Sequence, residues 1–146
     1  MEALIGTVIS LISPYLVKGA EEFAKSAGAA AFEGTKALVE RMAKWWRNDP
    51  VAEAAAKAIP QDPKRYAAVL ADQLAHDLPK DEVLAADLRR LVSTVGPSAE
   101  IVQKIKFADG VTGADIVNFI KGRISIHQEI DVGRNVVGVK IKDFGG

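Results

Sequence analysis

The chain has 146 residues, 49% of them hydrophobic, and its 19 lysines and arginines balance 19 aspartates and glutamates. This length fits one domain or two very small ones, with enough apolar residues for a core of ordinary size. The balanced charge argues against a nucleic-acid partner, because no net field attracts phosphates. The absence of cysteine excludes disulfides, thiolate nucleophiles and cysteine-bound metals, and it fits a cytoplasmic protein.

The first segment, Met1–Val17, is mostly apolar but contains Glu2 and Pro14. It is shorter than the roughly 20 residues that a membrane-spanning helix needs, and no basic region of a secretory signal precedes it. We therefore expect a cytoplasmic protein in which this helix is either deeply buried or associated with a membrane. The apolar side chains that would make a membrane contact cover much of the helix circumference: Leu4, Ile5, Val8 and Ile12.

Ser13–Pro14 is typical of a helix start, with serine as N-cap and proline in the first turn. From there apolar residues recur every three or four positions as far as Trp45, which predicts one continuous helical stripe. The middle of this stripe is small, at Ala27, Ala31 and Gly34. Because small residues let another backbone approach closely, we expect these three to pack between neighbouring subunits.

Further helices are predicted from residues that typically start or end a helix. Asp49–Pro50 and Asp62–Pro63 each place a capping aspartate before a proline, which is typical of a helix start. Lys80–Val95 carries apolar residues on one face, and Gly96–Pro97 ends it. Residues 1–97 therefore read as a helical domain.

The rest of the chain, residues 98–146, has a different pattern. Short runs in which isoleucine and valine alternate with polar residues are separated by glycines at intervals of 11 or 12: Gly110, Gly122, Gly133 and Gly145. Evenly spaced turns between alternating runs favour β-strands, and we interpret Ala114–Ile120 as one of them. Asp109–Gly110 is a tight-turn dipeptide. The predicted fold class is α+β, an N-terminal helical bundle followed by a small C-terminal antiparallel β-meander.

The alternation in this β-rich region places one apolar row on one face of the predicted sheet. Such a face is covered either by helices of the same chain or by another copy of the chain. We expect the second arrangement, so that residues of this row form an oligomer interface: Ile124, Ile126, Val137, Val139 and Ile141.

The sequence contains little that resembles a catalytic or metal site. His76 and His127 lie in different regions of the chain. Asp81 and Glu82 complement the positive end of the helix that they begin, rather than forming an acid–base pair with Asp87. We predict no metal, no cofactor and no small-molecule substrate, and a protein that is not an enzyme.

The strongest candidate for a contact site is a local group of aromatic and basic residues: Trp45 and Trp46 with Arg41, Lys44 and Arg47. Adjacent residues on a helix point about 100° apart, so both rings do not enter one narrow core. One tryptophan is expected in the core, and the other at a subunit contact or at anionic lipid headgroups.

The order of parts resembles uncharacterised bacterial proteins with an Ala-rich helical N-terminal region and a Gly-punctuated β tail. The resemblance is carried by Asp49–Ala54, by the capped helices after Asp62–Pro63 and by the tail Ile124–Ile141. Tails of this type are similar to amyloid-signalling motifs, which stack to transmit an oligomerisation state to an effector. The resemblance implies self-assembly.

We therefore predict a non-catalytic, homo-oligomeric scaffold or signalling protein of a bacterial defence or signalling system, with filaments as one form of assembly. The alternative is a membrane-active, pore-forming effector that uses the apolar N-terminal helix. In that case the protein is membrane-associated, and lipid is its second partner after another copy of itself.

Overall fold

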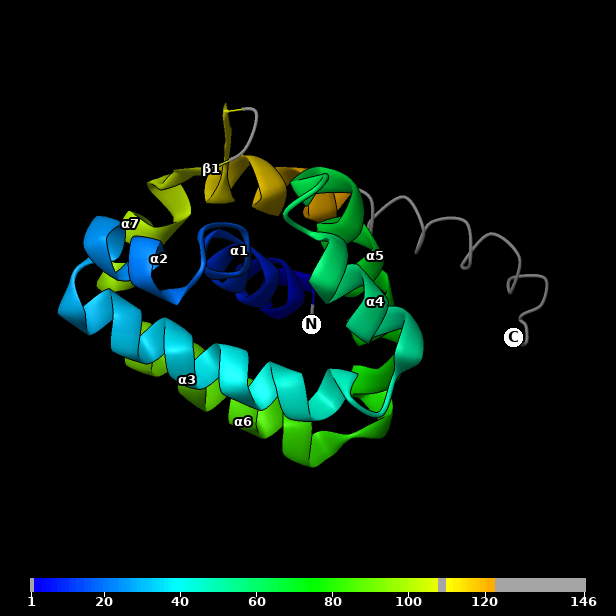
Figure 1. Cartoon of the computed structure of the whole chain (residues 1–146). Helices are drawn as coiled ribbons and strands as arrows, with labels where there is room; N and C mark the ends of the chain where they lie inside the picture. Colours follow the sequence, from blue (N-terminus) through cyan, green and yellow to red (C-terminus); the bar gives the residue numbers. More distant parts are fainter. Residues whose placement is uncertain (1, 108–109, 123–146) are drawn as a thin grey trace.

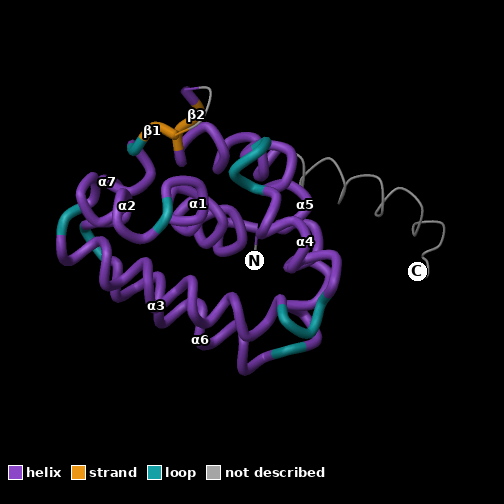
Figure 2. The backbone as a smooth tube through the Cα atoms, in the orientation of Figure 1, coloured by secondary structure: helices purple, strands orange, loops and turns teal. Residues whose placement is uncertain are grey.

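The structure of the chain, a computed structural model, describes residues 2–107 and 110–122. These residues form mainly helices, with one short two-stranded antiparallel sheet (Figure 1; Figure 2). In chain order the elements are α1 (Glu2–Lys18), α2 (Ala20–Ala27), α3 (Ala29–Trp46), α4 (Pro50–Ala58), α5 (Pro63–Asp77), η1 (Leu78–Lys80), α6 (Glu82–Val95), α7 (Ser98–Lys104), β1 (Lys106–Phe107) and β2 (Val111–Thr112). Residues 113–122 form a further helix, called the 113–122 helix below.

Helix α1 lies in the middle of the bundle, and Figure 1 shows the other helices arranged around it. It contacts α2, α3, α5, α6, α7 and β1. Five of its apolar side chains are at most 1% exposed: Ile5, Val8, Ile9, Leu11 and Ile12. A helix that is apolar all round is stable in water only when it is buried in this way. Of the two sequence-based alternatives for this segment, the described structure has the buried one.

The predicted helix start at Ser13–Pro14 is wrong, because α1 continues through both residues to Lys18. Ser13 is fully buried, and its hydroxyl donates a hydrogen bond to the Ile9 carbonyl at 2.6 Å. A serine inside a helix satisfies its hydroxyl by this bond to the preceding turn. The packing around α1 therefore outweighs the local preference of proline for a first turn.

The stripe predicted as one helix is divided at two glycines that sequence reasoning treated as helical. Gly19 has φ 85° and ψ 159°, and Gly28 has φ 85° and ψ 169°. Essentially only glycine adopts this backbone region. The chain consequently turns at both positions and forms α1, α2 and α3 in place of one long helix.

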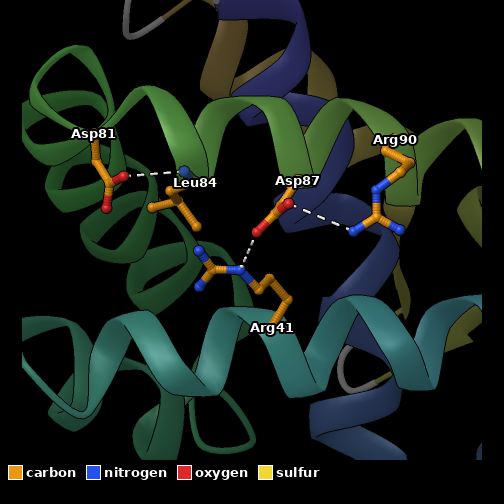
Figure 3. Close-up of polar contacts among 5 residues, drawn as sticks. All are labelled: Arg41, Asp81, Leu84, Asp87 and Arg90. Atoms are coloured by element: carbon orange, nitrogen blue, oxygen red, sulfur yellow. Dashed lines mark hydrogen bonds and ion pairs between the residues drawn. The ribbon is translucent and has the colours of Figure 1, made fainter.

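The predicted aspartate caps are confirmed. Asp49 accepts a hydrogen bond from the Ala52 amide at 3.2 Å, and Asp62 accepts one from the Arg65 amide at 3.3 Å. Pro50 and Pro63 follow at the first positions of α4 and α5. Asp81 caps α6 in the same way, accepting a hydrogen bond from the Leu84 amide at 3.0 Å (Figure 3).

The predicted β-rich region is only partly β-structure where it is described. Lys106 pairs with Thr112 and Phe107 with Val111, in a hairpin that Figure 2 shows in orange. The residues before it form helix α7, although a β-rich region was predicted from residue 98 onward. The predicted sheet is therefore a two-stranded hairpin within the described residues.

The strand predicted over Ala114–Ile120 is wrong, because these residues belong to the 113–122 helix. The Thr112 amide donates to Asp115 Oδ2 at 3.1 Å, and the Asp115 amide donates to Thr112 Oγ1 at 3.2 Å. This reciprocal pair is a capping box, which satisfies amides that the first turn leaves without a helical partner. Ile116 and Ile120 are fully buried at the four-residue spacing of one helix face.

Residues 98–122 pack on the helices that precede them. The Gly6 Cα of α1 faces the 113–122 helix, where a methyl group would lie 4.0 Å from Val117. At Gly113 a methyl group would lie 2.7 Å from the Gln103 Cα, so only glycine allows this approach to α7. The interface residues predicted in the tail lie outside the described residues: Ile124, Ile126, Val137, Val139 and Ile141.

Candidate interaction surface

The small residues predicted to pack between subunits lie against other parts of the same chain. Ala31 is buried in the core, and Ala27 is half-buried at the end of α2. Gly34 faces α6, where an added methyl group would lie 3.1 Å from Val95 Cγ2 and 3.3 Å from its Cα. The expected close approach of two helices is therefore present at Gly34, and it joins α3 to α6 within one chain.

The residues predicted to contact a membrane or a partner fall into two groups. Ile5, Val8 and Ile12 are buried inside the bundle, and Leu4 is half-buried. Among the described residues, no single helix has the length and apolar composition to cross a membrane. Two consecutive helical segments, Ala3–Lys18 and Ala20–Ala27, reach that length and apolar composition only when they are taken together. They are bent by 117° relative to each other.

The two tryptophans divide as predicted between the core and a more exposed position. Trp45 is 8% exposed, and its indole N–H donates to Asp77 Oδ2 at 2.9 Å. Because a buried indole N–H needs an acceptor, this bond fixes the end of α3 against the end of α5. Trp46 is half-buried, so part of its surface remains available for contact.

The basic residues near these tryptophans have different roles. Arg41 Nε donates to Asp87 Oδ2 at 2.8 Å and links α3 to α6, and Arg90 Nη2 lies 3.4 Å from Asp87 Oδ1 (Figure 3). The hydrogen bond from Arg41 is the largest influence that lowers the pKa of Asp87 below its ordinary value. Arg41 is therefore a structural link between helices, and it also lines a hollow of about 460 Å³ together with Glu40 and the exposed Lys44 and Arg47.

An apolar groove between α4 and α5 was not predicted from the sequence. It has a volume of about 480 Å³ and is lined by seven residues: Pro50, Val51, Ala54, Ala55, Ala58, Tyr66 and Val69. Val51 is 51% exposed, and the Arg65 guanidinium lies 5.3 Å from the centre of the Tyr66 ring at one side. The alanines spaced three and four residues apart on α4 leave space beside Tyr66, but this spacing alone does not give the distance between α4 and α5.

The described surface includes polar side chains close to one another and apolar side chains open to solvent. The Lys80 and His76 side chains approach each other at 3.3 Å on an exposed surface. Within the described ranges, no three His, Asp or Glu side chains come together to hold a metal ion. Large apolar side chains that are open to solvent, by contrast, occur on α4, on α6, on α7 and on the 113–122 helix: Val51, Val83, Ile101 and Phe119.

Comparison of the chain with protein-family models, with curated proteins and with solved structures finds no match.

Proposed function

We propose that the protein is a non-catalytic scaffold or signalling protein that assembles with copies of itself through its C-terminal segment. In this proposal the helical bundle is a folded platform, and residues 123–146 join the copies as a β-meander. The observation that carries the proposal is the alternation of isoleucine and valine with polar residues, in Ile124–Val132 and again in Val137–Ile141. Apolar β-branched segments of this kind form tight contacts between identical chains.

The end of the described structure supports this arrangement. Ile116 and Ile120 are buried against the bundle, so the 113–122 helix is fixed there immediately before the assembly segment. Phe119 on the same helix is 43% exposed. This exposed aromatic ring comes shortly before the segment in the chain and provides apolar surface that assembled copies would bury.

Light scattering of the purified chain tests the proposal directly. We expect a mass that is a multiple of the 15.6 kDa of one chain, rising with protein concentration, and electron microscopy to show the form of the assembly. Ile126→Lys and Val139→Lys place a charge in the apolar row and are expected to reduce assembly at least about tenfold, since burying an unpaired charge is costly.

Ser125→Lys is the matched control, because it adds the same charge at the adjacent position on the opposite, polar row. It should leave assembly nearly unchanged. Circular dichroism of each variant establishes that the helical bundle is retained. A strict monomer at high concentration would contradict the proposal, and so would equal effects of Ser125→Lys and Ile126→Lys.

A membrane-active effector is the second candidate, favoured by one observation. The segment from Ala3 to Ala27 has the apolar composition of a bent membrane segment. Because α1 is buried, this function requires the bundle to open at the membrane. Leakage of a dye from vesicles with neutral and with anionic lipids is the measurement, and the absence of both binding and leakage would remove this candidate.

A further inference from the structure

The α4–α5 groove is an apolar surface that the described part of the chain leaves open to solvent. Its lining consists of proline, valine, alanine and tyrosine side chains, among which Val51 is 51% exposed. Its volume of about 480 Å³ lies within the range of about 300–1,000 Å³ that is usual for ligand sites. Such a lining favours an apolar occupant, because contact with it removes apolar surface from water.

The length of the groove limits what it holds. The lining residues of α4 run from Pro50 to Ala58, and this part of the helix is about 12 Å long. In an extended segment, side chains two positions apart lie on one face, about 7 Å from each other. The groove therefore has the length for two neighbouring side chains of an apolar row.

The last described helix lies near one wall of this groove. Hydrogen bonds from Thr112 are the largest influence that lowers the pKa of Asp115 in the 113–122 helix, and the positive charge of Lys64 in α5 adds to it. The start of α5, which carries Tyr66 of the groove, is therefore close to the 113–122 helix, as Figure 1 also shows. The chain thus continues beyond residue 122 on the side of the bundle where α5 begins.

The residues that follow Gly122 have enough length to reach the groove. An extended chain from Gly122 to Ile130 spans about 26 Å, whereas a domain of this size has a radius of gyration of about 14 Å. A segment on so short a tether is present at an effective concentration of millimolar order. At micromolar protein concentrations, the groove therefore meets the segment of its own chain far more often than that of another copy.

The groove has an excess of positive charge around it. The exposed Arg65 guanidinium lies 5.3 Å from the centre of the Tyr66 ring, which lines the groove. Residues 50–69, which include the whole lining, carry three cations and two carboxylates: Lys57, Lys64 and Arg65 against Glu53 and Asp62. Complementary charge therefore favours an acidic segment over a basic one.

Charge also distinguishes the two apolar runs of the C-terminal segment. Ile124–Val132 contains Glu129 and Asp131 and no lysine or arginine, whereas Val137–Ile141 contains Lys140. Both carboxylates of the first run lie at its end, next to the last two members of its apolar row. The last three residues of the first run therefore have both the apolar pair and the charge that the groove favours.

From these observations we propose that the α4–α5 groove binds Ile130–Val132 of the same chain. Ile130 and Val132 enter the groove, and Asp131, on the opposite face of an extended segment, stays at its open side with the exposed Arg65. Docking withholds part of the apolar row from other copies, so it restrains assembly until the segment is released. This restraint rests on the proposed function, whereas the docking itself does not.

A pair of cysteines tests the docking in the full chain, which has no cysteine of its own. Ala54→Cys together with Val132→Cys places thiols on the two sides of the proposed contact, since Ala54 is an exposed residue of the groove. In dilute protein under mild oxidation, we expect a disulfide within one chain. It should form at least about tenfold faster than in the control pair Ala86→Cys and Val132→Cys, because Ala86 is exposed on α6, away from the groove. Equal rates would overturn the docking, and so would disulfides that form only between chains, seen as a doubled mass on a non-reducing gel.

Ala54→Glu tests the restraint, because it fills part of the groove and repels the acidic segment. We expect the concentration at which light scattering detects assembly to fall at least about threefold, since a larger fraction of the segment is free. Ala86→Glu is the matched control and should leave this concentration unchanged. If Ala54→Glu loses helix content in circular dichroism, Val51→Glu provides the same test at another exposed lining residue.

The two experiments separate the docking from the proposed function. An intrachain disulfide in a chain that never assembles would leave the docking in place and contradict the proposed function and the restraint. Assembly that Ala54→Glu changes no more than Ala86→Glu does would overturn the restraint and leave the proposed function in place.

Discussion

The helices of the first third of the chain and those that follow are joined in different ways. Helices α1, α2 and α3 meet at Gly19 and Gly28, whereas α4, α5 and α6 each begin at an aspartate that caps the first turn. An aspartate cap fixes where a helix starts, because its carboxylate binds an amide that has no helical partner. At the two glycines no side chain caps the next helix, and the glycine only allows the positive φ of the turn. The positions of α1, α2 and α3 therefore depend more on the packing of their side chains.

In the glycine-jointed region, the helices are positioned mainly by apolar contacts. The apolar side chains of α1 are buried in the core, α1 contacts α2, α3, α5, α6 and α7, and the Tyr15–Phe23–Phe32 rings join α1, α2 and α3 where they meet. In the capped region, by contrast, local hydrogen bonds and the Trp45–Asp77 and Arg41–Asp87 contacts add polar constraints. The two regions should consequently respond differently to backbone and to polar substitutions.

Alanine at the glycine joints should have the largest effect. Gly19→Ala and Gly28→Ala force a side chain into a backbone region that essentially only glycine adopts, at a cost of about 1–3 kcal/mol each. We expect the free energy of unfolding, measured by urea titration, to fall by this amount. The loss should be present although neither new methyl group would meet an atom within 4 Å.

Gly122→Ala is the control for these two substitutions. Gly122 is helical, and a methyl group there would also meet no neighbour. Because alanine favours a helix over glycine, this change should be neutral or stabilise the protein by up to about 1 kcal/mol. A loss at Gly122 equal to that at Gly19 would contradict the importance of the joint angle.

The sequence predicted the capped region well and the glycine-jointed region poorly. At Asp49–Pro50 and Asp62–Pro63, the interactions that start a helix involve only residues up to three positions further along the chain. The predicted starts of α4 and α5 at these pairs are confirmed. At Gly19 and Gly28 the three- and four-residue apolar spacing continues through the joint, so nothing local distinguishes a turn from a helix interior. The bends depend on the backbone angles of the two glycines and on contacts with distant residues, such as the burial of Phe23.

In the C-terminal part, by contrast, the sequence does contain a local signal for a helix, although a strand was predicted there. Thr112 and Asp115 have the spacing of a capping box, yet the regular glycines favoured a strand after them. The α4–α5 groove was not predicted because it depends on the distance between two helices, which alanine spacing on one of them does not give. That only one of the adjacent tryptophans is buried followed from helix geometry, whereas this geometry does not say that the buried one is Trp45.

Removal of a cap should have a smaller effect than alanine at a joint. Asp49→Ala, Asp62→Ala and Asp81→Ala each leave an amide of the first helical turn without its acceptor, with an expected loss of about 1 kcal/mol in urea unfolding. Asparagine accepts the same bond, so the corresponding Asp→Asn variants should retain most of the stability. Equal losses for alanine and asparagine would show that charge near the helix end, rather than the capping bond, is the stabilising feature.

The polar link between α3 and α6 should have the smallest effect and a distinct dependence on pH. Because Arg41 holds the pKa of Asp87 below its ordinary value of 3.8, the folded state favours the ionised carboxylate. Its contribution to stability is present above that value and is lost as the pH falls through the lower pKa of the folded protein. We therefore expect Asp87→Asn to be less stable than the natural chain at about pH 7, and the difference in urea midpoint to shrink below about pH 4. Arg90→Gln, which removes the weaker partner at 3.4 Å, should give a smaller difference with the same direction. If Asp87→Asn instead loses the same stability at every pH, the link between α3 and α6 depends on side-chain packing and not on the charge of Asp87.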